Sequence, residues 1–105
     1  MADHYDLIAI GAGSGGLSVA ERAAAHGARV AIVEDGALGG TCVNVGCVPK
    51  KVMWYAAGVA ETLHDAAGYG FTLDGWRFDW ATLKAAREKL IEGITGFYGN
   101  WMADN

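Results

Sequence analysis

The chain has 105 residues, of which 52% are hydrophobic and 19% charged, with eight Lys and Arg against twelve Asp and Glu and a net charge of −4. This length is enough for one domain at most, and the apolar content excludes an intrinsically disordered polypeptide. Nucleic acids and anionic membranes bind clustered Lys and Arg, so the acidic balance predicts that neither is a partner.

The ends and the apolar runs of the chain predict a cytoplasmic protein. The first six residues, MADHYD, are acidic and lack the basic start of a signal peptide. The longest apolar run, residues 52–60, is much shorter than the ~20 residues that a membrane-spanning helix needs.

The first third of the sequence predicts a β-turn-α-β unit. Residues 5–10 (YDLIAI) and 29–33 (RVAIV) are short apolar runs typical of buried parallel strands. Between them lie a glycine cluster and an Ala-rich helix over residues 17–26, which ends at Gly27. The fold class is therefore α/β, with a Rossmann-type unit at the start.

The rest of the chain predicts two helices. Pro49 suits the first turn of a helix, following the cysteines, that continues over residues 52–65 to a break at Gly68. Residues 69–77 are irregular, with a short extended piece. Asp79 is a suitable N-cap for a last helix. One amphipathic stripe follows it: Trp80, Leu83, Arg87, Leu90, Ile91, Ile94, Tyr98 and Trp101, in which Arg87 is the one polar residue.

Only two strands are predicted, whereas a doubly wound nucleotide-binding half needs three. Two interpretations stay open. The chain is a small complete α/β domain with a shielded two-stranded sheet, or residues 1–105 are the N-terminal portion of a longer dinucleotide-binding domain.

The glycine cluster Gly11-x-Gly13-x-x-Gly16 predicts a dinucleotide-binding loop. The first glycine allows a tight turn, the second lets backbone N–H groups approach a pyrophosphate, and the third lets helix and strand pack closely. Glu34 ends the second strand, near the position expected for an acid that binds ribose hydroxyls. Its carboxylate would repel a 2′-phosphate, so the loop suits FAD or NAD. A glycine-rich turn beside a solvated Glu34 is the alternative.

Cys42 and Cys47 form a C-x₄-C pair. His4, His26 and His64 are scattered, so we predict no metal site. A disulfide needs Cα atoms roughly 4.4–6.8 Å apart, whereas five residues of regular helix rise about 7.5 Å. The pair can therefore bridge only if the start of the helix is distorted, which Gly46 permits. Such a disulfide in a reducing compartment predicts a redox device, and a structural bridge is the alternative.

Residues 39–51 (GGTCVNVGCVPKK), following the dinucleotide loop, resemble the signature of the class I pyridine nucleotide–disulfide oxidoreductases. The continuation Lys50-Lys51-Val52-Met53-Trp54 is most similar to the glutathione reductase branch. Dihydrolipoamide dehydrogenases and mercuric reductases usually carry Ser-Lys at the first two positions. Trypanothione and large thioredoxin reductases usually lack the Met-Trp. The resemblance extends from residue 5 to Tyr98, and these other branches remain alternatives.

The resemblance implies that FAD lies across residues 11–16 with its ribose on Glu34. Thr41 and Cys42 would approach the flavin and its phosphates, and Lys50 would lie near the isoalloxazine. The implied cofactor contacts are Gly11, Gly13, Ser14, Gly15, Gly16, Glu34, Gly40, Thr41, Cys42 and Lys50. NADPH, bound by a part outside this chain, would reduce the flavin.

The resemblance also implies a redox-active Cys42–Cys47 disulfide and glutathione disulfide as the substrate. Cys47 would be the charge-transfer thiolate near the flavin, and Cys42 would attack the substrate and form the mixed disulfide. Ser14 and Tyr98 match positions that contact glutathione, although Tyr98 also suits the core of the last helix. The whole enzyme would be a homodimer that serves thiol redox homeostasis.

Two departures from the family qualify these expectations. The family enzymes are several times longer, with NADPH, central and dimer-interface domains and a His–Glu acid/base pair from the partner subunit. We therefore expect the 105-residue chain alone to have no NADPH-dependent disulfide reductase activity. Glu21 stands where many members have a basic residue that holds a glutathione carboxylate. Arg22 would compensate, or the substrate has that carboxylate masked, or Glu21 is simply solvated.

A hypothesis from a different class also stays open. The chain would be a non-catalytic FAD- or NAD-binding module whose cysteines sense or store redox state. The run of residues 50–54 beside the cysteines favours the enzyme, because a simple binding module does not need it.

Overall fold

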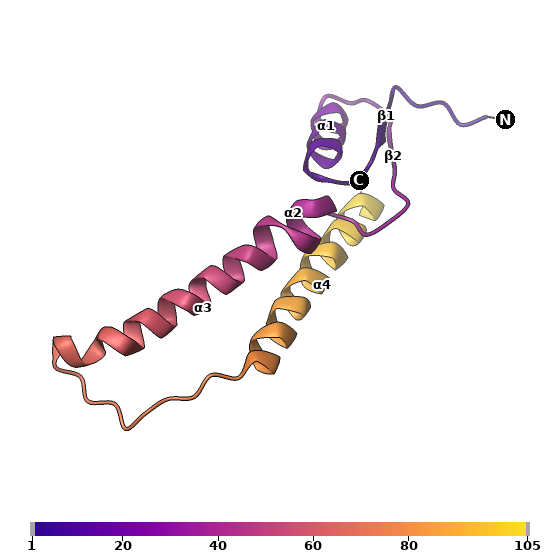
Figure 1. Ribbon diagram of the computed structural model, residues 1–105. Coiled ribbons are helices and arrows are strands. Elements are labelled where there is room, and N and C mark those ends of the chain that lie inside the picture. The colour runs from indigo at the N-terminus through magenta and orange to yellow at the C-terminus, as the bar shows by residue number, and fades with distance from the viewer. Residues whose placement is uncertain (1, 105) are drawn as a thin grey trace.

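A computed structural model describes residues 2–104 of the chain and has the α/β fold that the sequence predicts (Figure 1). Its elements are β1 (Leu7–Ile10), α1 (Ser14–Ala25), β2 (Val30–Val33), α2 (Gly40–Val45), α3 (Cys47–Asp65), the 3₁₀ turn η1 (Ala66–Tyr69) and α4 (Trp80–Asp104). The two strands are parallel, with Leu7 opposite Val30 and Ile10 opposite Val33. This pairing confirms the predicted β-turn-α-β unit.

Helix α1 begins three residues earlier than its sequence predicts. Gly13, at the N-cap, has an extended backbone, and the helix includes Gly15 and Gly16 despite the low helix propensity of glycine. Packing of Gly16 against the preceding turn outweighs that propensity. The predicted end is confirmed, because Gly27 has a φ of +86° and the Ala28 N–H donates to the Ala23 carbonyl.

The cysteine region forms two helices with a break between them at Gly46. Pro49 lies in the first turn of α3, as predicted. That helix ends at Asp65, as predicted. The 3₁₀ turn follows, and Gly70, with a φ of +88°, ends it.

The segment between η1 and α4 is irregular, as predicted, and holds no strand within the described residues. The predicted N-cap of α4 is confirmed. The Asp79 carboxylate accepts hydrogen bonds from the backbone N–H of Ala81 at 3.3 Å and from that of Thr82 at 3.1 Å. It also accepts one from the Thr82 hydroxyl.

The molecule is elongated. Its radius of gyration is 20.2 Å and its principal extents are 70 × 25 × 20 Å, whereas a compact domain of this length has a radius of about 13 Å. Helices α3 and α4 extend away from the β-turn-α-β unit and are joined at the far end by residues 70–79 (Figure 1). The C-terminal part of α4 returns to α2.

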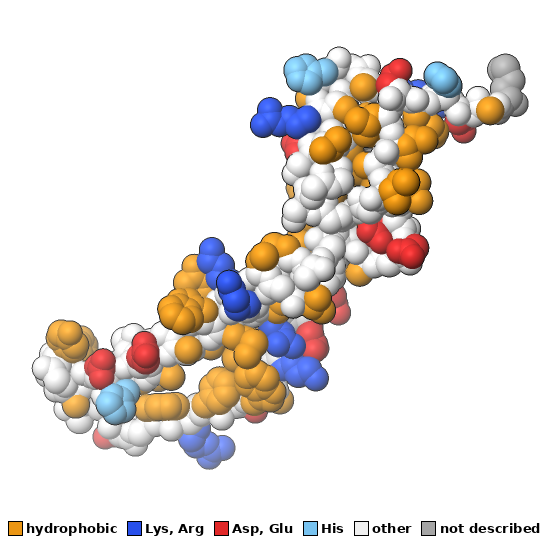
Figure 2. All heavy atoms as spheres, turned by 45° about the horizontal axis from the view of Figure 1, so that its top comes forward, with side chains coloured by type: hydrophobic (Ala, Val, Ile, Leu, Met, Phe, Trp, Pro, Cys, Tyr) orange, Lys and Arg blue, Asp and Glu red, His pale blue; other side chains and the backbone are white. Residues whose placement is uncertain are grey.

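Burial is concentrated at the glycine loop and the start of the cysteine region. The buried apolar side chains are Ala9, Ala12, Leu17, Ala20 and Val43. One face of the sheet is open, with Ile10 89% exposed. Apolar side chains also lie exposed along α3 and residues 69–80 (Figure 2). Within residues 2–104, no helix combines the length and apolar character needed to cross a bilayer.

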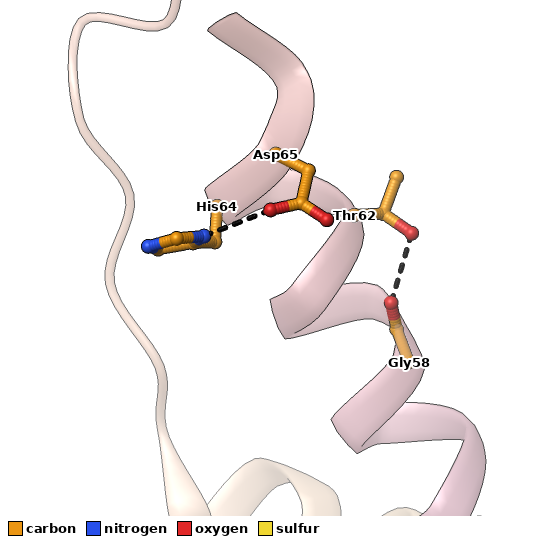
Figure 3. A network of polar contacts seen from close by, with 4 residues as sticks. All are labelled: Gly58, Thr62, His64 and Asp65. Carbon is orange, nitrogen blue, oxygen red and sulfur yellow. Dashed lines mark hydrogen bonds and ion pairs between the residues drawn. The ribbon is translucent and has the colours of Figure 1, made fainter. Parts of the chain in front are cut away.

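The C-terminal end of α3 carries only local polar contacts (Figure 3). The Thr62 hydroxyl donates to the Gly58 carbonyl at 2.8 Å, and His64 Nδ1 lies 2.9 Å from Asp65 Oδ1. The His64 side chain is 85% exposed, which confirms its interpretation as a surface group.

Candidate active site: a glycine loop and a cysteine pair

The glycine loop joins the end of β1 to the start of α1 in a turn that side chains would block. Gly11 has a φ of +103°, which L side chains rarely adopt. A Cβ at Gly16 would lie 1.8 Å from the Gly11 carbonyl oxygen. These positions therefore require glycine for conformation and for close packing, as the sequence predicts.

The N-terminus of α1 is open to a ligand. No side chain caps this helix, and no acidic residue lies in its first turn. Ser14 and Gly15 are exposed there, and a Cβ at Gly15 would meet nothing within 4 Å. Free N–H groups and the positive end of the helix dipole favour a phosphate. The loop thus fits the pyrophosphate of a dinucleotide.

Glu34 ties the glycine loop to the end of β2. Its Oε2 accepts a hydrogen bond from the Ala12 N–H at 2.7 Å. Its Oε1 accepts from the N–H groups of Asp35 at 3.0 Å and Gly36 at 2.9 Å. A carboxylate has about four acceptor positions, so one remains for a ribose hydroxyl. The structure thus adds a structural role to the ribose contact predicted for Glu34.

These hydrogen bonds hold the pKa of Glu34 below its usual value of 4.5, and the one from the Ala12 N–H has the largest effect. Because the pKa of Glu34 is lower in the folded chain, its ionised carboxylate stabilises the fold at pH values above the pKa that it has in the unfolded chain. This stabilisation is lost as the pH falls through the pKa of Glu34 in the folded chain. We expect Glu34→Gln to be less stable than the wild type at neutral pH, with a smaller difference at acid pH. Unfolding in denaturant, measured from about pH 7 to about pH 3, checks this.

Glu61→Gln, on the exposed side of α3, is the matched control for the loss of one carboxylate. The free energy of unfolding of Glu61→Gln should differ little from that of the wild type at every pH. A Glu34→Gln variant that behaves like this control would show that the carboxylate does not fasten the loop.

A second glycine turn packs against the first. The Gly39 N–H donates to the Ala12 carbonyl at 2.8 Å, and a Cβ at Gly40 would lie 2.8 Å from the Gly13 Cα. The amide of Asn44 donates to the carbonyls of Leu38 at 3.0 Å and Gly40 at 2.9 Å. The sequence analysis missed Asn44, because a single amide that donates to the backbone of the preceding turn leaves no periodic pattern.

The cysteines lie on either side of the helix break. Cys42 is in α2 and is half-buried, and Cys47 begins α3 and is exposed. A Cβ at Gly46 would lie 2.8 Å from the Thr41 carbonyl oxygen and 3.3 Å from the Cys42 Cα. Gly46 therefore lets the two turns approach each other, which confirms the distortion predicted for this helix start.

Both cysteines are free thiols in the structure, and they lie close together at the helix break. The neighbouring Cys47 side chain, together with partial burial, raises the pKa of the Cys42 thiol above its usual value. The positive charge of Lys50 acts in the opposite direction. This close pair is placed for thiol–disulfide exchange.

The expected substrate contacts lie mostly around one cavity of about 280 Å³ between α1 and α4. Ser14, Glu21 and Tyr98 line it, together with Leu17, Ser18, Phe97 and Trp101. Arg22 lies in the last turn of α1 and does not line this cavity. The cavity therefore presents the carboxylate of Glu21 without the compensation expected from Arg22.

Lys50 lines a different and larger cavity. This space of about 1290 Å³ lies between α3 and α4 and also includes Cys47. Thr41 is exposed in the first turn of α2. No group of three or more His, Cys, Asp or Glu side chains placed to hold a metal occurs in the part of the chain that the structure describes.

Comparison with known proteins decides the family. The family described as pyridine nucleotide-disulphide oxidoreductase matches residues 5–101. The chain belongs to this family. The resemblance inferred from the cysteine motif is thereby confirmed.

Two glutathione reductases are similar to this chain. The chain is 50% identical over 99 residues to that of Yarrowia lipolytica. It is 46% identical over 101 residues to that of Debaryomyces hansenii. Each match covers 90% of this chain and 21% of the relative. The chain thus spans about a fifth of the length of the curated relatives it matches.

Proposed function

We propose that this chain carries the flavin-binding loop and the redox-active cysteine pair of a reductase that passes electrons from NADPH to glutathione disulfide. The observation that carries the proposal is the close approach of Cys42 and Cys47 at the break between α2 and α3, which Gly46 allows. The similarity to two glutathione reductases supports glutathione disulfide as the substrate.

The residues of the glycine loop fit FAD. The N–H groups at the start of α1 would bind its pyrophosphate, and Glu34 would accept a hydrogen bond from its ribose. Gly40, at the start of α2, approaches the same loop, and Thr41 would contact the flavin from the next position. Bound flavin would supply a two-electron carrier between NADPH and the disulfide.

The cysteines carry out two exchange steps. After its proton passes to a base, the Cys42 thiolate attacks one sulfur of glutathione disulfide, which breaks the S–S bond and releases one glutathione as a thiolate. The Cys47 thiolate then attacks the Cys42 sulfur of the mixed disulfide, releases the second glutathione thiolate and closes the Cys42–Cys47 disulfide. Each released glutathione thiolate takes up one proton, and two electrons with two protons restore the Cys42–Cys47 dithiol.

Ser14 and Tyr98 would hold glutathione disulfide in the cavity between α1 and α4. Phe97 and Tyr98 provide aromatic walls, with ring centroids 5.8 Å apart. The Ser14 hydroxyl and the Tyr98 phenol offer hydrogen bonds to a peptide. Glu21 would disfavour a substrate carboxylate at its own position, because like charges repel.

Flavin binding tests the proposal directly. We expect FAD to bind the wild-type chain and Gly13→Val to weaken that binding at least tenfold, which is about 1.4 kcal/mol. A Cβ at Gly13 would already lie 3.7 Å from the Gly40 Cα, so the branched side chain would fill the space between the two glycine turns. Flavin fluorescence during a titration measures both affinities.

Gly93→Val is the matched control, because a Cβ at Gly93 on α4 would meet nothing within 4 Å. This variant should bind FAD as the wild type does. Equal FAD affinity in the Gly13→Val and Gly93→Val variants would refute the assignment of the glycine loop.

A further inference from the structure

Helix α2, which carries Cys42, is too short to be stable by itself. It has six residues, whereas isolated helices shorter than about 12 residues are marginal in water. Its sequence, GTCVNV, holds only residues of low helix propensity. Within residues 2–104, no side chain caps its N-terminus. Other contacts must therefore keep this helix folded and hold the Cys42 sulfur in place.

Asn44, in the last turn of α2, braces the helix against its own start. Its side-chain nitrogen donates to the Gly40 carbonyl at 2.9 Å and to the Leu38 carbonyl at 3.0 Å. A side-chain amide has two N–H donors, so these two bonds use both. Gly40 is the first residue of the helix, and Leu38 precedes its N-cap, Gly39. The half-buried Asn44 side chain thus joins the end of α2 to the turn before it.

That turn is in turn fastened to the glycine loop. The Gly39 N–H donates to the Ala12 carbonyl at 2.8 Å, and a Cβ at Gly40 would lie 2.8 Å from the Gly13 Cα. Helix α2 lies between the β-turn-α-β unit and α3 (Figure 1). Asn44 therefore connects a fixed turn on one side of α2 to the helix break on the other.

We propose that Asn44 is a positioning residue for thiol–disulfide exchange, because its two hydrogen bonds keep α2 folded and Cys42 within reach of Cys47. This inference rests on the proposed function of the cysteine pair. When the pair reacts with glutathione disulfide, an S–S bond forms between Cys42 and Cys47 and the glutathione S–S bond breaks. The two thiol protons pass to the two glutathione sulfurs. A flexible dithiol loses more conformational entropy on closing than a braced one, so Asn44 favours the closed disulfide.

The equilibrium constant for closing the disulfide in glutathione buffers tests this role. We expect Asn44→Ala to lower that constant at least tenfold, which is about 30 mV. Asn44→Ser should lower it roughly three- to tenfold, because a helix hydroxyl can still donate to the carbonyl four residues earlier, here that of Gly40. Asn44→Asp keeps the size of the side chain but loses the donors when ionised, so it should lower the constant at least as much as Asn44→Ala. A side chain that only fills space would leave Asn44→Asp like the wild type.

Two controls separate positioning from general stability. Ala20→Gly removes a buried methyl group from α1, and Asn100→Ala removes an exposed amide from α4. Both should keep the equilibrium constant within about twofold of the wild-type value. The disulfide is measured by mass after alkylation, at a temperature where circular dichroism shows each variant to be folded.

The outcomes distinguish this inference from the proposed function. A wild-type chain that closes no intramolecular disulfide would overturn both. A normal wild-type equilibrium that Asn44→Ala and Asn44→Asp share, or an equal shift in Ala20→Gly, would overturn the role of Asn44 alone. If Asn44→Ala is unfolded, Asn44→Ser decides, and a wild-type equilibrium constant in that variant would likewise refute the role.

Discussion

Gly16→Ala should destabilise the chain by about 1–3 kcal/mol and remove flavin binding, the largest effect expected for adding one methyl group. A Cβ at this position would lie 1.8 Å from the Gly11 carbonyl oxygen and 3.0 Å from its carbon. Both are backbone atoms of the turn, so a rotamer change cannot relieve the clash. The turn would have to move away from α1, and the N–H groups at the start of that helix would move relative to Glu34.

Gly15→Ala is the adjacent control. A Cβ at Gly15 would meet nothing within 4 Å, and both residues lie in the first turn of α1. Ala favours a helix over Gly by up to about 1 kcal/mol, so this variant should be as stable as the wild type or more stable. Thermal unfolding followed by circular dichroism compares the three chains. If Gly16→Ala is as stable as Gly15→Ala, the glycine loop does not pack against α1 as closely as described.

Oxidised glutathione should remove both free thiols of the wild-type chain and leave an intramolecular Cys42–Cys47 disulfide without bound glutathione. The close approach of the two turns at Gly46 places the second sulfur near any mixed disulfide formed by the first. The intramolecular attack then has a high effective concentration and outruns reaction with another glutathione. Mass spectrometry after alkylation of the remaining thiols identifies the products.

The single variants supply the comparison for this reaction. Cys42→Ser and Cys47→Ser should each stop at the mixed disulfide with glutathione, because neither has a second thiol to displace it. Accumulation of a mixed disulfide in the wild type to the same level as in these variants would mean that the cysteines act independently.

Local patterns in the sequence predict the elements of this fold well. The apolar runs before the glycine cluster and before Glu34 give β1 and β2, and Asp79 marks the start of α4. The boundaries differ where tertiary contact outweighs propensity, as at the glycines in the first turn of α1. The irregular segment over residues 70–79 was predicted correctly, although its aromatic residues favour strands, because glycines interrupt any regular pattern there.

The candidate site combines local and distant contributions. The C-x₄-C spacing and Gly46 predict a distorted helix start, since both depend on neighbours in the chain. The contact of Gly40 with Gly13 depends on how separate turns meet, which spacing alone does not encode.

A redox titration of the cysteine pair tests the central claim most directly. The chain is equilibrated in buffers of reduced and oxidised glutathione, quenched by alkylation, and the fraction with an intramolecular disulfide is measured by mass. The account predicts one reversible two-electron transition, with about 30 mV for each tenfold change in the ratio of disulfide to dithiol. A chain in which Cys42 and Cys47 stay reduced, or carry only separate glutathione adducts, across the whole range would contradict it.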